Sequence, residues 1–393
     1  MKQTGSADLK LMGGYIPDWL FGRMVALARP VVESVVLQYG WEGFLQRLSD
    51  PYWFQAFGAV IGMDWNSSGV TTAVMRALKQ ALNPVAHELG MYVCGGKGTD
   101  ATNTPHELLA IGDKTGIDAD ALVRCSRLSA KVDSAAVQDG FQVYLHFFVL
   151  TADGGWAVVQ QGMRPADGAA RRYHWLSSAI RSFVEEPHAA VCGEELGPIL
   201  NLTDRAAAPT RQGILQLAAM PAPALQQACR HLRMPRHDDV SAADVNLKRL
   251  TAILHLAYQQ DIGQFEDLLL LKGLGARTLQ SLTLVSEVIH GTPSRFADPA
   301  RFSLAHGSKT AKPFAVPTRV YDEVVVQLQT AVAAARLGHT DRHQAIGNLS
   351  KWAGRLEARV AAPVSFDAYL QFEKQQSHRH GGRSLDGWVA PPA

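Results

Sequence analysis

The chain has 393 residues, and 47% of them are hydrophobic, which is ordinary for a folded protein of two or three domains. Its formal charge is only +2, so any nucleic-acid surface has to be a local patch. The four cysteines are widely spaced without a CxxC pair, which argues against a zinc knuckle and a secreted disulfide framework. A membrane span needs about 20 consecutive uncharged apolar residues, and the sequence has no such run. We therefore expect a cytoplasmic protein without a membrane partner.

Apolar residues recur at helical intervals over 20–48 and 54–82, which predicts a mostly helical N-terminal region. The glycine-rich stretch 95–99 follows, and its backbone amides are suited to wrapping a phosphate while Lys97 supplies a charge. We therefore expect Lys97 to contact a nucleic-acid backbone, with a plain surface turn as the alternative. The next helix has a clear start signal, in which Thr104 is the N-cap and Glu107 completes a capping box.

The pattern then changes to alternation over 141–150 and 156–163, and an Asp-Gly-Gly turn joins the two runs. This pattern predicts a β-hairpin. The following segment, RRYHW at 171–175, interleaves guanidinium groups with aromatic rings. Such a mixture suits phosphate contact combined with base stacking, so Arg171 and Arg172 are predicted nucleic-acid contacts. In the alternative, the tryptophan fills the core and the arginines cover a solvated face.

The C-terminal part is again helical, and residues 265–291 read as a helix, a glycine turn and a second helix. A Gly-Leu-Gly turn lets the backbone take positive φ and approach a ligand, while the amides that open the second helix point at an anion. This segment resembles the helix-hairpin-helix element of DNA repair proteins. The resemblance implies that Lys272, Gly273, Gly275 and Arg277 hold the backbone of duplex DNA without reading bases. An ordinary helical hairpin with a glycine C-cap is the alternative.

Several motifs, taken in order, resemble one prokaryotic family from end to end. They are MKQTGSADLKLMGG, WLFGRM, LSDPYWFQA, MDWNSSGVTT, GGKG, AKVDSAAVQDG, WAVVQQGM, RRYHWLS and the glycine hairpin. The chain is similar to the family catalogued as domain of unknown function 763, whose members occur in archaea and bacteria. The family name implies no biochemistry, so function has to come from the residues.

Oxygen- and nitrogen-bearing side chains gather around the predicted β-hairpin. Asp133, Asp139 and Gln161 are the predicted ligands of a Mg²⁺ or Mn²⁺ ion, which would generate a hydroxide for phosphodiester hydrolysis. His146 and His174 are the predicted proton-transfer groups. The arrangement faintly resembles restriction-nuclease sheets, although QQG stands where those sheets carry an acid and a lysine. In the alternative, the two aspartates make turns and caps and His146 is a hydrogen-bonded sheet histidine.

A carboxylate downstream of the glycine turn suggests a different chemistry. In base-excision glycosylases with a helix-hairpin-helix, an aspartate follows the hairpin at a similar interval and assists departure of the base. Asp298 occupies the corresponding place in this chain. It is followed by proline, however, and is equally well explained as an N-cap with proline at the first helical position.

Together these elements predict an α+β protein, with mostly helical N- and C-terminal regions around a central antiparallel β-hairpin region. The predicted divisions are 1–123, 124–210, 211–374 with the hairpin element, and a flexible tail at 375–393. The expected function is DNA repair or DNA processing on duplex or structured DNA, with a metal-dependent nuclease as the first hypothesis. The alternatives are a non-catalytic DNA-binding adaptor and a DNA glycosylase that uses Asp298.

Overall fold

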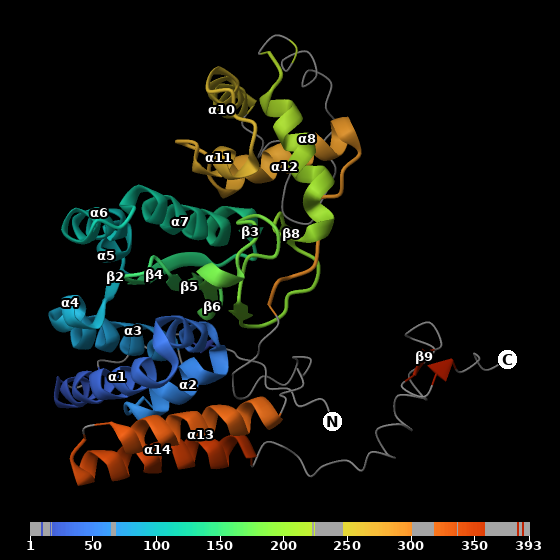
Figure 1. Ribbon diagram of the computed structural model, residues 1–393. Helices are drawn as coiled ribbons and strands as arrows, with labels where there is room; N and C mark the ends of the chain where they lie inside the picture. Colours follow the sequence, from blue (N-terminus) through green and yellow to red (C-terminus); the bar gives the residue numbers. More distant parts are fainter. Residues whose placement is uncertain are drawn as a thin grey trace.

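The protein consists of an antiparallel sheet between two helical layers, with a further group of helices stacked on one of them (Figure 1). The computed structural model describes residues 9–10, 16, 18–63, 68–221, 224, 247–300, 318–335, 337–357, 383–384 and 387–388.

The first layer contains helices from both ends of the chain. They are α1 (Asp18–Ser49), α2 (Pro51–Val60), α3 (Ser68–Leu82), α13 (Thr318–Ala334) and α14 (His339–Glu357). Asp50 sets the start of α2, because its carboxylate accepts the amides of Tyr52 and Trp53 and proline follows it at the first helical position. Leu328 and Leu349 of the last two helices share one apolar core with Leu45 of α1. The short α4 (Ala86–Leu89) leads into the sheet.

The main sheet has the strand order β1-β6-β5-β4-β2, and β7 also pairs with β6. Its strands are β1 (Leu9–Lys10), β2 (Met91–Lys97), β4 (Gln142–Thr151), β5 (Trp156–Arg164), β6 (Ala169–Leu176) and β7 (Ala190–Cys192). The predicted hairpin is confirmed as β4 and β5, with Gly154 at φ +85° in the turn. Two short pairs lie apart from this sheet: β3 (Val137–Gln138) with β8 (Leu200–Asn201), and β9 (Arg383–Ser384) with β10 (Gly387–Trp388).

The other face of the sheet is covered by α6 (Thr104–Thr115) and α7 (Ala119–Lys131), preceded by the single turn α5 (Thr99–Thr102). A π-helical turn, η2 (Val132–Ala136), continues α7 into β3. Beyond α7 lie α8 (Ala208–Ala218), α10 (Leu247–Gln259), α11 (Phe265–Leu270) and α12 (Ala276–His290) (Figure 1).

Apolar side chains from both faces of the sheet enter a core. Phe147 and Val159 pack with the first helical layer, whereas Phe148, Val158 and Trp175 pack on the α7 side. Successive residues of a strand point to opposite faces. Because helices cover both faces here, the polar side chains in the middle of β4 to β6 are buried in one layer or the other. This arrangement decides the environment of most of the predicted site residues.

The α+β class is confirmed, while the layers cut across the predicted divisions of the chain. Strand β2 lies within the part that was expected to be helical, and α13 and α14 pack on the N-terminal helices rather than beside the hairpin element. The predicted tail lies outside the described residues except for β9 and β10. Among the helices that the structure describes, none combines the length and the apolar character needed to cross a bilayer.

Candidate functional site

Strand β6 carries two adjacent arginines whose side chains leave the strand on opposite faces. Arg171 pairs with carboxylates on the α7 side, whereas Arg172 extends toward α2, where its guanidinium carbon lies 4.5 Å from the centroid of the Phe54 ring. The two residues are 0% and 1% exposed. Neither arginine therefore lies on a surface that DNA can reach, and the expectation that they contact DNA is corrected. The cause is the helical cover on both faces of the strand.

Arg171 is the centre of a buried and neutralised cluster. It donates to Asp139 at 2.9 Å and to both oxygens of Asp298 at 2.8 Å. Asp139 also accepts from the hydroxyl of Tyr173 at 2.7 Å. Although burial works against the charged form, the two carboxylates raise the pKa of Arg171 above its ordinary value. The cluster ties β6 to the segment that follows η2 and to the segment around Asp298, which is a structural role.

Arg172 has no such neutralisation. It forms no ion pair with any residue that the structure describes, and its Nη1 atom has no hydrogen-bond partner there. Its Nε donates to Nε2 of His174 at 2.8 Å, and its guanidinium also hydrogen-bonds the side chain of Cys192. Burial lowers the pKa of Arg172. Burial and the neighbouring guanidinium hold the pKa of His174 well below its usual range. His174 is therefore a buried, neutral acceptor, and the catalytic role predicted for it does not fit its surroundings.

A second buried carboxylate on the α7 side belongs to Asp133, in the π-helical turn η2. Its Oδ2 accepts from Gln160 at 2.6 Å and from the indole N–H of Trp175 at 2.9 Å, and its Oδ1 lies 2.5 Å from Nε2 of His188. Burial raises the pKa of Asp133, and the three partners oppose that shift. The contact with His188, which the sequence analysis did not single out, connects this carboxylate to a cavity.

The hydrogen bonds behind Asp133 have a fixed direction. The amide of Gln160 gives its Nε2–H to Asp133, so its Oε1 is an acceptor for Nδ1–H of His146 at 2.8 Å. Nε2 of His146 then accepts from the hydroxyl of Ser126 at 2.9 Å. Burial lowers the pKa of His146 to about 4, so the ring is neutral, as this direction requires. His146 therefore positions Gln160 rather than meeting a substrate.

The predicted metal ligands do not come together. Asp133 and Asp139 lie on the α7 side of the sheet, whereas Gln161 pairs in register with Arg172 and faces the other side. Gln161 donates to the hydroxyl of Tyr144 at 2.6 Å. Among the described residues, no group of three or more His, Cys, Asp or Glu side chains is arranged to hold a metal ion. The residues do not fit a Mg²⁺ or Mn²⁺ centre, and we derive no hydrolytic step from them.

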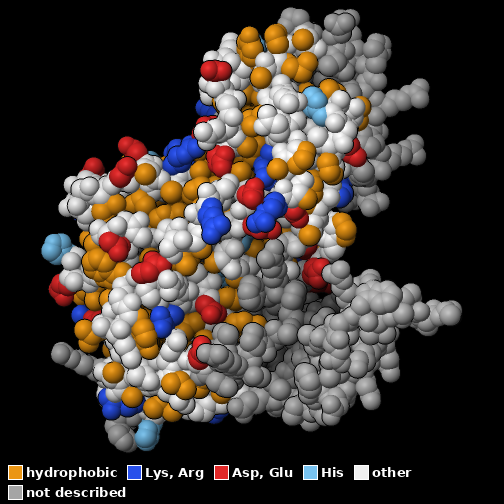
Figure 2. All heavy atoms as spheres, turned by 45° about the vertical axis from the view of Figure 1, so that its right-hand side comes forward, with side chains coloured by type: hydrophobic (Ala, Val, Ile, Leu, Met, Phe, Trp, Pro, Cys, Tyr) orange, Lys and Arg blue, Asp and Glu red, His pale blue; other side chains and the backbone are white. Residues whose placement is uncertain are grey.

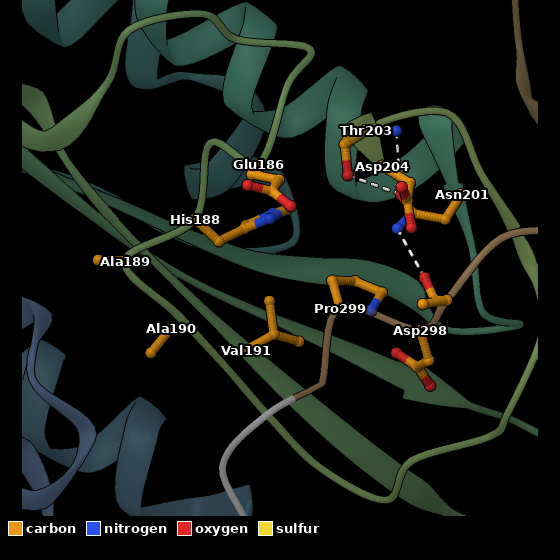
Figure 3. Close-up of a pocket in the computed structure, with 11 residues that line it drawn as sticks. Glu186, His188, Ala189, Ala190, Val191, Asn201, Thr203, Asp204, Asp298 and Pro299 are labelled. Carbon is orange, nitrogen blue, oxygen red and sulfur yellow. Dashed lines mark hydrogen bonds between the residues drawn. The ribbon is translucent and has the colours of Figure 1, made fainter. Parts of the chain in front are cut away.

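A cavity of about 190 Å³ opens beside β7 and β8 (Figure 3). Its lining residues are Glu186, His188, Ala189, Ala190, Val191, Asn201, Thr203, Asp204, Ala297, Asp298 and Pro299. The figure shows the imidazole of His188 beside Glu186, opposite Asn201 and Thr203. The backbone of Glu186 has φ +45°, which is uncommon for a residue other than glycine, and its amide donates to the carbonyl of Thr203 at 2.8 Å.

The segment predicted as helix, glycine turn and helix is α11, a turn at 271–275, and α12. Gly273 has φ +91°, but Gly275 is extended at φ −130°, so only Gly273 uses the left-handed region. No side chain caps α12 at Gly275, and a Cβ there would meet nothing within 4 Å. Lys272 and Arg277 are exposed on either side and form no ion pair with any described residue. The opening amides of α12 are thus uncovered and flanked by two cations.

The turn is held from the α7 side by two hydrogen bonds. Nζ of Lys131 donates to the carbonyl of Leu274 at 2.6 Å, and Nε2 of Gln138 donates to the carbonyl of Ala276 at 2.8 Å. Both contacts satisfy carbonyls and leave the amide side of the turn open. The turn is therefore fixed to the same short segment, 131–138, that contains Asp133.

Three basic residues of α7 that face the turn were not among the residues predicted from the sequence. Arg124 of α7 pairs with Asp267 of α11 at 2.7 Å, and Lys131 reaches the turn itself. Arg127 lies between them at helical spacing, three residues after one and four before the other, so it shares their face of α7. It is exposed and has no ion pair within the described parts of the chain. The helical spacing of the three basic residues was visible in the sequence. That their face of α7 packs beside α11 and the glycine turn was not.

The glycine-rich stretch predicted to wrap a phosphate is instead the end of edge strand β2. A Cβ on Gly95 would lie 2.1 Å from the carbonyl oxygen of His146, so this glycine permits close approach of β4. Lys97 is exposed at the strand end, with Nζ 5.6 Å from the centroid of the Tyr144 ring. Gly95 and Gly96 are buried, so within this stretch only the exposed residues 97–99, with Lys97 as their cation, remain accessible to an outside ligand.

The predicted capping box is also absent. Asn103 is the N-cap of α6 and Thr104 is its first helical residue. Glu107 accepts from Lys79 at 2.7 Å and from the amide of Gly95 at 2.7 Å. The carboxylate therefore links α3, α6 and β2 instead of satisfying the helix start.

The sheet, the cavity and the glycine turn all lie within one family match. Residues 5–316 match the family model described as Protein of unknown function (DUF763). The chain belongs to this DUF763 family. Neither the curated proteins nor the solved structures contain a match to it. The DUF763 match ends before α13 and α14, although these two helices pack in the same core as α1 and α2.

Within this DUF763 protein, Asp298 has the surroundings of a structural residue. Besides the two bonds from Arg171, its oxygens accept the amides of Leu196 and Ala300 at 2.8 and 2.9 Å. Its carboxylate is directed to Arg171, away from His188 across the cavity (Figure 3). The bond to Ala300 is local, but residues 299 and 300 are not helical, so the N-cap that was the alternative for Asp298 is not formed within the described residues. The glycosylase role predicted for Asp298 therefore lacks a carboxylate that is open to a substrate.

Proposed function

We propose that this protein binds the backbone of duplex or structured DNA through the turn between α11 and α12, as part of DNA repair or DNA processing. The observation that carries the proposal is the uncovered start of α12 at Gly275, flanked by Lys272 and Arg277. Backbone amides and lone cations contact phosphates at any base sequence, so binding is expected to be independent of sequence.

The charge distribution agrees with a local site. On the face shown in Figure 2, basic and acidic side chains are intermingled and no large basic field is visible. Near the turn, Asp267 is neutralised by Arg124, while Lys272, Arg277 and Arg127 keep their charges unpaired among the described residues. A small basic surface of this size supports binding that weakens as salt is added, with a slope set by its few phosphate contacts.

The proposal is limited to binding. The ligand set expected for a nuclease is divided between the two faces of the sheet, and Asp298 is held by Arg171. The adaptor hypothesis, in which the turn anchors DNA and the β region recruits a partner, is therefore the form of DNA processing that the geometry supports best.

Gly275→Val is the most informative variant. Its backbone is extended and its surroundings are open, so valine fits without strain but places a branched side chain over the amides of α12. We expect the fold to be retained and the affinity for duplex DNA to fall for every sequence alike. Fluorescence anisotropy of labelled duplexes, measured over a series of salt concentrations, gives the affinity and its salt slope.

Gly354→Val is the matched control, because Gly354 is also open and lies on α14, across the sheet from the turn. It should bind DNA as the unmodified protein does. If the unmodified protein binds no duplex at low salt, or if Gly275→Val binds as tightly as Gly354→Val, the turn is not a DNA-binding element.

A further inference from the structure

The cavity beside β7 is lined by a histidine, His188, whose ring is held by a buried carboxylate on the side away from the cavity. The side chain of His188 is 5% exposed, and its Nε2 lies 2.5 Å from the fully buried carboxylate of Asp133. Asp133 is itself held by Gln160 and Trp175, which can only donate to it. These two donors occupy Oδ2 and leave Oδ1 for His188, so that with Asp133 ionised Nε2 of His188 is the donor in this contact.

The other ring nitrogen of His188 is the one available to a ligand. In the neutral ring, a protonated Nε2 leaves Nδ1 as an acceptor. Nδ1 has no hydrogen bond within the part of the chain that the structure describes. Because His188 lines the cavity, this lone pair is available at the cavity wall (Figure 3). Hydrogen bonds from His146 through Gln160 and from His188 thus converge on Asp133, and they leave Nδ1 of His188 facing the cavity.

The remaining ionisable groups of the wall are acidic. Glu186 and Asp204 line the cavity with His188, and no lysine or arginine is among the described lining residues. Arg205 pairs with Glu186 at 3.1 Å and offsets part of its charge, although its side chain is 73% exposed and lies outside the lining. Oδ1 of Asp204 accepts the amide of Ala206, and no cation pairs with this carboxylate among the described residues. Asp298, the third acid, is neutralised by Arg171. The field in the cavity therefore favours a cation and opposes a phosphate.

The size of the cavity limits what can enter. Its volume of about 190 Å³ is smaller than the roughly 300 to 1,000 Å³ of pockets for drug-sized ligands. We propose that it binds a small organic cation, an alkylammonium or guanidinium compound of a few heavy atoms, with Nδ1 of His188 and the carboxylates of Glu186 and Asp204 as acceptors. This site is separate from DNA binding by the α11–α12 turn, so either proposal can fail without the other.

The test uses the full chain with n-butylamine and methylguanidinium as probes, and n-butanol and methylurea as their neutral counterparts. Titration calorimetry gives the affinities, and ring ¹⁵N spectra of labelled histidine report on His188. We expect millimolar or tighter binding of the cations alone, with a shift of the Nδ1 resonance. Glu186→Gln and Asp204→Asn should each weaken binding about tenfold, since each removes one charge-assisted hydrogen bond.

Glu185→Gln is the matched control, because Glu185 precedes Glu186 but does not line the cavity. It should bind the cations as the unmodified protein does. Equal binding of neutral and charged probes, no binding of either cation, or equal losses in Glu185→Gln and Glu186→Gln would overturn the proposal. A blocked lysine amide that binds more tightly than n-butylamine would also overturn it, because the occupant would then be a protein side chain.

Discussion

Arg171 and Arg172 are neighbours in the sequence, but only Arg171 is paired with carboxylates. Its guanidinium contacts Asp139 and Asp298, whereas Arg172 contacts His174 on the opposite face of β6 and has no acidic partner among the described residues. Both side chains are buried. The pair therefore offers the same substitution in two environments that differ mainly in charge compensation.

We expect Arg171→Met to destabilise the protein by about 3 to 5 kcal/mol, because it leaves two buried carboxylates without their cation. Arg172→Met should cost at most about 2 kcal/mol, since it removes a buried charge that no carboxylate balances and leaves His174 and Cys192 each without one hydrogen-bond partner. Urea unfolding of both variants measures the difference. Equal losses would show that the contacts of Arg172 with His174 and Cys192 stabilise its charge as well as the two carboxylates stabilise that of Arg171.

Asp298→Asn tests the glycosylase alternative against the structural role. The substitution keeps the shape but removes the charge opposite Arg171, so we expect a loss of about 3 kcal/mol in the free energy of unfolding. This is more than the roughly 1 kcal/mol of a deleted cap. Duplexes with damaged bases, incubated with the unmodified protein and a chelator, should show no alkali-labile sites. Base release that disappears in Asp298→Asn would restore the glycosylase.

The parts of the fold that follow from short-range pattern were predicted well. Alternation and an Asp-Gly-Gly turn gave β4 and β5, and glycine with helical spacing gave α11 and α12. The opposite directions of Arg171 and Arg172 could also have been anticipated, because successive side chains of any strand point to opposite faces. What the pattern could not show is that both faces are covered, which depends on α2 and α7 packing from distant parts of the chain.

The candidate site was harder to predict for the same reason. His188 follows a proline in an irregular segment, and nothing local indicates that Asp133, far back in the sequence, lies 2.5 Å from it. Glu107 has the spacing of a capping box, yet Lys79 and Gly95 compete successfully for its carboxylate. Contacts between residues far apart in the sequence decide the surroundings of both side chains, and the local pattern of one sequence does not show such contacts.

His146 should make the protein sensitive to acid. Its pKa is about 4 in the folded protein, below the ordinary value of 6.5. In the unfolded chain His146 is protonated below about pH 6.5, whereas in the folded protein it stays neutral down to about pH 4. The free energy of unfolding therefore decreases as the pH falls through this window. The loss for this group alone is about 3 kcal/mol at most.

His146→Asn isolates this contribution, because asparagine can still donate to Gln160 but does not titrate. Urea unfolding at about pH 7 and about pH 4.5 should show a smaller difference in the variant than in the unmodified protein. His174, whose pKa is also lowered, is present in both proteins and cancels in the comparison. The same pH dependence in both proteins would mean that His146 is protonated, or exposed, in the folded state.

Arg127 tests how far the proposed DNA surface extends from the turn onto α7. Arg127→Gln should reduce the slope of log affinity against log salt by about 0.9, the value for one lost phosphate contact. Arg23→Gln is the control, because Arg23 is an exposed arginine of α1, on the other side of the sheet. If Gly275→Val weakens binding while Arg127→Gln leaves the slope unchanged, the duplex touches the turn but not α7. If neither variant has an effect, the duplex does not bind at this end of the molecule.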